Sequence, residues 1–365
     1  MKIKALLLLT IALFWSTAMW AQVTTSGING KVTGTNGESL PSATVIAVHT
    51  PSGTQYGTLT DLDGNYQITN MRVGGPYTLT ITFVGYKPFV KSDLILNLGQ
   101  TLGTDVNLAE ESSQLSGVTV VSKRNALIDG NRTGASTNLR SDQIQSLPTI
   151  NRSITDFTRL SPQSNGNSFA GRDGRYNNIT IDGANFNNNF GLSAKSLPGG
   201  DAQPISLDAI EEINVNVAPF DIRQSNFTGA NVNAVTRSGD NTWKGSVYGF
   251  YRDKSFNGKK IEDKEITLTD QTTSSYGVRF GGPLIKNKLF IFANAEKEKS
   301  SYPGISWQPS TDGVGDPDLF ISRTSEADLE TVRNYLINTY SYDPGTYKDF
   351  GNFASENYKI LAKID

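Results

Sequence analysis

Alternation of apolar and polar residues in the last third of the chain constrains its fold most strongly. Residues 243–252, WKGSVYGFYR, place Trp243, Val247 and Tyr251 on one side of an extended strand. The same two-residue period returns in residues 274–282, 289–298 and 357–365. Side chains along a strand point alternately to its two faces, so this period predicts four strands with one apolar and one polar face.

The connections between these four segments differ in length. The first, 254–273, is long, the second, 283–288, is short, and the third, 299–356, is very long and contains an expected helix at 325–339. Outer-membrane barrels alternate long outer loops with short periplasmic turns, whereas a soluble sandwich gives no reason for that alternation. Residues 242–365 are therefore predicted to be the incomplete start of a transmembrane β-barrel.

Short strands separated by turn residues mark a separate region near the N-terminus. Turn residues include Asn36-Gly37, Ser52-Gly53 and Gly74-Gly75-Pro76. Regular spacing of this kind predicts a small β-sandwich over residues 27–108. The expected strands are 28–33, 44–49, 55–60, 65–68, 77–83, 89–96 and 104–108.

The region between the sandwich and the barrel strands mixes helix and strand patterns. A polar linker, 109–122, precedes it, and residues 123–238 are predicted to form a small mixed α/β domain. Ser141 is the expected N-cap of its first short helix. The other expected elements are a helix at 153–160, a helical turn at 207–211, and strands at 175–182, 213–217 and 231–236.

The order of sequence blocks resembles a known family. RYNNITIDG precedes ISLDAIEEINV and the first alternating strand, as in the plug and first barrel strand of TonB-dependent outer-membrane transporters. GKVTGTNGESLPSATVIA, TLTDLDGNYQI and PYTLTITFVGY resemble the carboxypeptidase regulatory-like domain. Together they resemble the Oar-like branch of these receptors. The resemblance implies a mainly β fold with an N-terminal β-sandwich, a mixed α/β plug and the first strands of a transmembrane barrel.

The resemblance also implies a function and partners. It predicts a receptor that imports an extracellular ligand, sits in outer-membrane lipid and is energised by TonB and its inner-membrane complex. A short β-prone segment before the plug, the TonB box, would pair with TonB by strand addition. Here that segment holds Val118, Thr119, Val120 and Val121. A first plug strand or a plain linker strand is the alternative interpretation.

An amide-rich loop and two arginines in the plug are the expected ligand contacts. Amides can bind hydroxyl or peptide groups, and aromatic rings offer apolar faces. A solvated turn-rich loop is the alternative, because Asn tolerates left-handed backbone, and plug arginines can pair with the barrel wall instead. The candidate residues are Arg172, Arg175, Asn185, Phe186, Asn187, Asn188 and Phe190.

Composition excludes several other functions. The chain has no Cys and one His, His49, so Cys-based metal sites and disulfides are absent. No Walker loop, His-Glu-x-x-His or Gly-x-Ser-x-Gly motif is present; no catalytic residue, metal or cofactor is predicted.

Asp61 to Asn65 look like the start of a calcium loop, but its twelfth position is Arg72, so an Asx turn is expected. A net charge of -2 suggests no nucleic-acid partner.

The N-terminus predicts export. Two lysines, an apolar run and small residues up to Ala21 have the layout of a signal peptide over residues 1–21. The expected location is the outer membrane, with the sandwich and plug on the periplasmic side. A closed barrel of about 22 strands needs a longer chain, so the sequence is predicted to be an N-terminal fragment. The alternatives are a secreted or surface-exposed adhesion protein and, less favoured, a glycosidase or peptidase with accessory domains.

Overall fold

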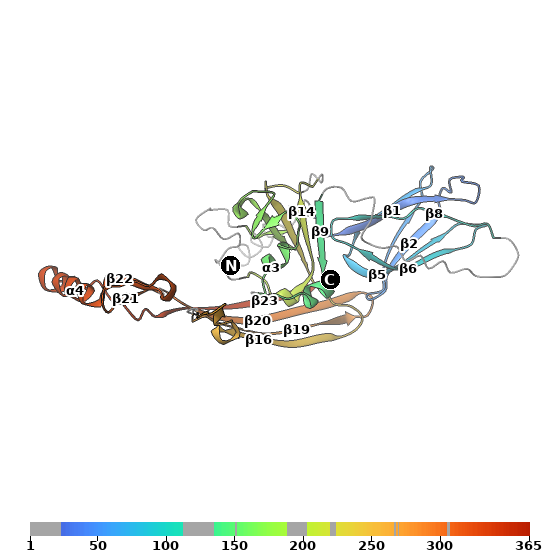
Figure 1. Ribbon diagram of the computed structural model, residues 1–365. Helices are drawn as coiled ribbons and strands as arrows, with labels where there is room; N and C mark the ends of the chain where they lie inside the picture. Colours follow the sequence, from blue (N-terminus) through green and yellow to red (C-terminus); the bar gives the residue numbers. More distant parts are fainter. Residues whose placement is uncertain are drawn as a thin grey trace, which may run out of the picture. The chain divides into compact units, whose positions relative to one another are not determined.

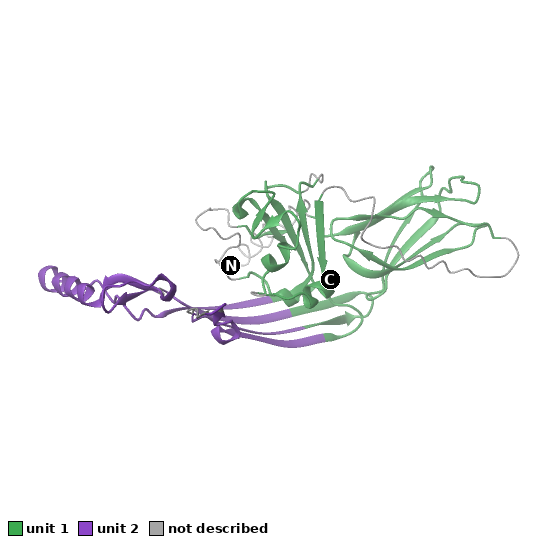
Figure 2. Ribbon diagram, in the orientation of Figure 1, with its two compact units in different colours: residues 1–244, 280–293, 361–365 green, residues 245–279, 294–360 purple. Residues whose placement is uncertain are grey.

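A computed structural model describes residues 23–111, 135–149, 152–187, 203–219, 224–265, 268, 270–304 and 307–365. The described part is mainly β (Figure 1), which confirms the predicted fold class. The chain divides into two compact units (Figure 2). One contains residues 1–244, 280–293 and 361–365, and the other contains residues 245–279 and 294–360.

The first region is a sandwich of two sheets. One sheet has the order β4-β1-β7, with β8 also paired to β1, and the other has the order β3-β2-β5-β6. Alternate residues of β2 and β5, among them Val45, Leu79 and Ile81, are fully buried in the shared core. The strands are β1 (Ser26–Thr33), β2 (Thr44–His49), β3 (Thr54–Leu59), β4 (Asn65–Met71), β5 (Gly74–Thr82), β6 (Phe89–Leu96), β7 (Thr101–Gly103) and β8 (Val106–Asn107).

The strand expected at 104–108 is shortened to β8, and the preceding β7 was not predicted. β7 and β8 both pair with β1 in parallel, but the chain between them leaves the regular ladder. There the Asp105 carboxylate, at 2.9 Å, accepts the backbone N–H of Lys31. A side chain therefore replaces a backbone acceptor at this point, which a pattern of apolar residues does not reveal.

Asp61 has the structural role expected of it, and His49 also has a structural role in the sandwich. Asp61 Oδ1 accepts the backbone N–H groups of Asp63 at 3.0 Å and Asn65 at 2.7 Å, as in an Asx turn. His49 is buried, and its Nδ1 lies 2.7 Å from Ser52 Oγ. Burial, with a smaller contribution from Arg72, lowers the pKa of His49 to about 4, so the ring is neutral at pH 7.

The second region is a five-stranded mixed sheet with short helices. Its order is β13-β12-β15-β14-β9, in which β12 and β15 are parallel. Phe157, Ile179, Ile213 and Val232 lie in its buried core. Its elements are β9 (Ala135–Arg140), α2 (Ser141–Ser146), α3 (Ile154–Thr158), β10 (Ser164–Asn165), β11 (Ser168–Phe169), η2 (Gly174–Tyr176), β12 (Asn178–Ile181), β13 (Ala184–Asn185), η3 (Leu207–Ala209), β14 (Ile210–Val217) and β15 (Ala230–Thr236).

The predicted N-cap at Ser141 is wrong. The cap is Arg140, and Ser141 is the first helical residue. Gln143 Oε1 accepts the backbone N–H of Arg140 at 3.1 Å and so supplies a capping contact that Ser141 was expected to organise.

Two other elements begin or end differently from the prediction. The strand expected from Arg175 begins at Asn178, because Asp173 accepts the Arg175 N–H at 2.9 Å and folds residues 174–176 into a 3-10 turn. The helical turn expected at 207–211 ends at Ala209, because Ile210 pairs with Thr236 in the sheet.

The third region is a four-stranded sheet in which sequence neighbours are also spatial neighbours, β16-β19-β20-β23. Its strands are β16 (Lys244–Asp253), β19 (Thr272–Ile285), β20 (Leu289–Pro303) and β23 (Asn352–Ile364). These agree with the four predicted alternating segments. Figure 1 shows the four labelled strands running side by side.

The long, short and long connections are also confirmed. Residues 286–288 join β19 to β20 directly. The first long connection holds η4 (Lys254–Phe256), β17 (Lys260–Ile261) and β18 (Lys264–Glu265), and the second holds β21 (Gln308–Ser310), η5 (Pro317–Leu319), β22 (Ile321–Ser325) and α4 (Glu326–Tyr340). α4 matches the predicted helix within one residue, with Ser325 as its N-cap. Among the described residues, no helix has both the length and the apolar character needed to cross a membrane.

Candidate functional site

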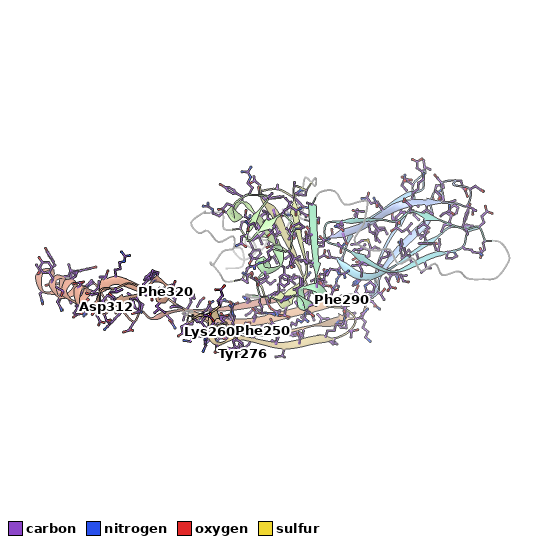
Figure 3. All side chains as sticks on the ribbon, viewed as in Figure 1. Phe250, Lys260, Tyr276, Phe290, Asp312 and Phe320 are labelled. Atoms are coloured by element: carbon purple, nitrogen blue, oxygen red, sulfur yellow. The ribbon has the colours of Figure 1, made fainter. Side chains whose placement is uncertain are left out.

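The outward-facing side of the four-stranded sheet is apolar and exposed. Val247 is 84% exposed and Ile360 is 82% exposed, although both lie in regular strands. A contiguous apolar face of this kind is unfavourable in water and suits contact with lipid. Tyr276 and Phe250 of this sheet are labelled in Figure 3. The exposed apolar residues include Trp243, Val247, Tyr251, Tyr276, Val278, Phe280, Tyr358, Ile360 and Ile364.

The opposite side of the same sheet carries a buried ionic cluster. Lys359 Nζ lies 2.7 Å from Glu296 Oε1 and 2.6 Å from Glu298 Oε2. Tyr248 donates a 2.9 Å hydrogen bond to Glu296 Oε2 and accepts one from Asn294 at 3.3 Å. The Lys359 and Glu296 side chains are only 6% and 5% exposed. Each buried charge would therefore be strongly unfavourable without its partner. The polar side of the sheet thus links β16, β20 and β23 through side chains, across the intervening β19.

A ladder of amide side chains crosses the five-stranded sheet of the second region, which is the region predicted to be a plug and is called the plug below. Asn178 donates to Asn231 at 2.9 Å, and Thr180 donates to Asn233 at 3.0 Å. On the other side of β15, Asn214 donates to Ser136 at 3.0 Å. These groups alternate along their strands with the apolar core residues, so the sheet has one apolar and one amide face.

Sequence reasoning missed this amide ladder. Its signal was present in STNL, NITI, INVNV and NVNAV, where polar residues alternate with apolar ones. Asn was interpreted as a turn residue, and the pairing of four separate strands was required to bring the amides together.

The two predicted ligand-contacting arginines lie on exposed turns of the plug. Arg172 follows β11, and Arg175 lies in η2. The Arg175 guanidinium is bound to the Asp173 carboxylate through contacts of 3.0 and 3.4 Å. The Asp173 hydrogen bond raises the pKa of Arg175, and the same contact lowers the pKa of Asp173. Both side chains are about half exposed, so the pair can meet an external molecule.

The predicted amide loop is more firmly held than a solvated loop. Asn187 Oδ1 accepts the Ile179 N–H at 2.6 Å, and its Nδ2 donates to Asn178 at 2.8 Å. Phe186 is half-buried and packs against the plug core. Asn185 is exposed and accepts the Asn187 N–H at 2.9 Å. The structure therefore keeps Asn185 accessible while Phe186 and Asn187 contribute to the fold.

Some predicted site residues lie outside the described part of the chain. They are Asn188 and Phe190 of the amide loop and the whole candidate TonB contact, Val118, Thr119, Val120 and Val121. Within the described ranges, no group of three or more His, Cys, Asp or Glu side chains could hold a metal ion.

Two domain families match the chain. Residues 27–109 match the carboxypeptidase regulatory-like domain, and residues 235–315 match an outer membrane beta barrel domain. The chain is 27% identical over 274 residues to the TonB-dependent transporter Oar of Myxococcus xanthus, covering 69% of this chain and 25% of that protein. The chain thus spans about a quarter of the length of the curated relative that it matches. These matches confirm the predicted resemblance to Oar-like TonB-dependent receptors.

Solved structures show weaker likeness. The siderophore receptor PirA of Acinetobacter baumannii is 20% identical with a TM-score of 0.35, covering 46% of this chain and 24% of that one. The outer membrane transporter YddB of Escherichia coli is 18% identical with a TM-score of 0.35, covering 49% and 28%. At these scores neither likeness carries an argument, and the interpretation depends on the sheet geometry and the sequence matches.

Proposed function

We propose that the chain is the N-terminal part of a TonB-dependent outer-membrane receptor that imports an extracellular ligand. One observation carries the proposal: a mixed α/β domain leads directly into a sheet whose apolar face is exposed and whose charged face is buried. Soluble sheets have the opposite arrangement, whereas barrel strands in lipid require this one. The similarity to Oar over 69% of the chain supports the same function.

The proposed ligand contact is the exposed polar surface of the plug formed by Arg172, Arg175 and Asn185. It offers guanidinium and amide donors on turns that extend from a rigid sheet. Asn188 and Phe190 complete the contact in this proposal. Phe186 and Asn187 anchor the loop to the core and to β12. Such groups suit a ligand with carboxylate, hydroxyl or peptide oxygens. The ligand-bound receptor is a transporter in this proposal and carries no catalytic site.

The proposed gate is controlled by TonB. Val118 to Val121 would add a strand to TonB in the periplasm, where main-chain hydrogen bonds supply the affinity. Tension from the inner-membrane complex would then remodel the plug. The sandwich and plug lie on the periplasmic side in this arrangement, after removal of the signal peptide.

The TonB contact is tested by one proline substitution. Val120→Pro removes a backbone N–H from the segment, whereas Val120→Thr keeps it and the β-prone shape. Full-length receptor in outer-membrane vesicles is mixed with the periplasmic domain of TonB, and the bound TonB is measured. We expect binding to fall about tenfold or more with Val120→Pro and to remain with Val120→Thr. Equal binding by the proline variant and the wild type would place the TonB contact elsewhere.

A further inference from the structure

The turn between β6 and β7 of the sandwich contacts the plug sheet. Gln100 N donates to Asn97 O at 3.2 Å, and Gly99 has a φ of +69°, so residues 97–100 form a tight turn with glycine where positive φ is needed. The turn presents Leu98, which is 1% exposed. Leu98 packs with Val73 of the sandwich and Val235 of β15 in a small cluster separate from the sandwich core. The plug residue Val235 therefore contributes to the burial of Leu98.

The same turn has a polar contact with a buried carboxyl. Leu98 N donates a 3.0 Å hydrogen bond to Glu212 Oε1 on β14. Glu212 is 1% exposed, and its Oε2 has no hydrogen-bond partner among the described residues. An ionised carboxylate in this position is unfavourable, because one oxygen is removed from water without a replacement donor.

The charged groups around Glu212 leave it largely uncompensated. Glu211 adjoins it on β14 and is itself 3.9 Å from Arg237, while Arg140 of β9 is paired with Asp142. Burial, the largest cause, and the nearby Glu211 raise the pKa of Glu212 to about 8, against the lowering effects of Leu98 N and Arg140. On the sandwich side, Arg72 is directed to the carbonyl of Gly239 at 3.0 Å.

Further contacts extend the joint along β15 and beyond its C-terminal end. Asn233 donates to the carbonyl of Val23, which packs against Gly99. Beyond β15, Asn241 N donates to Pro51 O at 3.0 Å in the connector that leads into the first barrel strand. The sandwich thus holds a plug strand and the plug–barrel connector at the same time.

We propose that the sandwich is a proton-sensitive clamp on the plug: the Leu98 turn docks on Glu212 and Val235, and loss of the Glu212 proton releases it. The clamp goes beyond the proposed import function, because it depends on neither the ligand nor TonB.

The direction of the pH effect follows from the docked and undocked states. In the docked state Glu212 retains its proton up to about pH 8, whereas an undocked, hydrated Glu212 ionises near its ordinary value of 4.5. The equilibrium constant for docking is therefore highest below about pH 4.5. It falls as pH rises toward 8, by up to about tenfold per pH unit. Glu212→Gln keeps an oxygen acceptor for Leu98 N and removes the ionisation.

Hydrogen exchange of the 97–100 turn in the full-length protein tests the clamp. Its protection, corrected for intrinsic exchange, is measured between pH 5 and pH 8 in outer-membrane vesicles. For the wild type we expect protection to fall with pH by up to about tenfold per unit. For Glu212→Gln we expect high protection that does not change with pH, and for the exposed control Glu110→Gln we expect wild-type behaviour.

A second variant tests the apolar contact. Leu98→Ala is expected to lower protection of the turn by about 30-fold or more at every pH, because it removes the buried side chain of the joint. Protection of β2 and β5 should not change, because Leu98 lies outside the sandwich core. Leu62→Ala, at a position that is 87% exposed, is the matched control. Protection that is equal in wild type and Glu212→Gln at every pH, or equal in Leu98→Ala and Leu62→Ala, would overturn the clamp.

Discussion

The plug sheet and the four-stranded sheet of the third region, here called the barrel sheet, both alternate apolar and polar residues, but they bury different faces. In the plug, the apolar face forms the core and Asn178, Asn214 and Asn231 on the other face are also buried and paired. In the barrel sheet, apolar residues such as Val247 and Ile360 are exposed and the charged Lys359 and Glu296 are buried. Under the proposed function the same period serves two solvents, with water around the plug and lipid around the barrel strands. Three substitutions test this difference, beginning with the largest expected effect.

Lys359→Met tests the buried charged face. The change leaves Glu296 and Glu298 close together without their cation, and we expect a loss of about 3–5 kcal/mol in stability. Urea titration of the full-length protein in lipid vesicles measures it. Lys299→Met is the control, because the Lys299–Glu356 pair is largely exposed and its loss should change stability little. Equal losses in the two variants would show that the face of Lys359 is hydrated.

Ile360→Arg tests the lipid-facing side one residue further along β23. Ile360 is 82% exposed, so in water the change would cost little, whereas an arginine facing the bilayer centre costs about 2–4 kcal/mol. The same urea titration measures the effect. The control is Leu62→Arg, at a turn residue of the sandwich that is 87% exposed. It should change stability by no more than about 0.5 kcal/mol. If Ile360→Arg were as mild as Leu62→Arg, this face would not contact lipid.

Asn214→Ala tests the amide face of the plug. It removes the hydrogen bonds to Ser136 and Asn138 inside the sheet, and we expect local stability to fall by about 1–3 kcal/mol. Hydrogen exchange of β14 and β15 in the full-length protein provides the measurement. Asn338→Ala on the exposed helix α4 is the control, with an expected effect within about 0.5 kcal/mol. A neutral Asn214→Ala would mean that water replaces the ladder.

The elements predicted well from sequence are those with a local pattern. Alternation alone located β16, β19, β20 and β23, because lipid on one side makes each strand independently amphipathic. The helix expected at 325–339 was likewise found within one residue of its bounds, as α4.

What sequence reasoning missed depends on residues far apart in the chain. Leu98 and Glu212 are separated by 114 positions, and neither has neighbours that mark it as part of a joint. The amide ladder similarly requires four strands to be paired in the correct register. The N-cap at Arg140 and the 3-10 turn at Arg175 were missed because a single side-chain hydrogen bond determines each of them. The site arginines were located on exposed turns, but their ligand stays a prediction.

The central claim is that β16, β19, β20 and β23 form a sheet with one face in contact with lipid and the other face away from it. These 365 residues contain no cysteine, so Ser246→Cys and Val247→Cys, each introduced into a full-length receptor kept free of other cysteines, provide single labelling sites on opposite faces of β16. Each is labelled with a fluorophore in full-length receptor, and quenching by nitroxide-labelled lipid is measured. We predict strong quenching at position 247 and little at 246, with the pattern repeating at 278 and 279. Equal quenching at both positions, or none at either, would contradict a lipid-facing sheet.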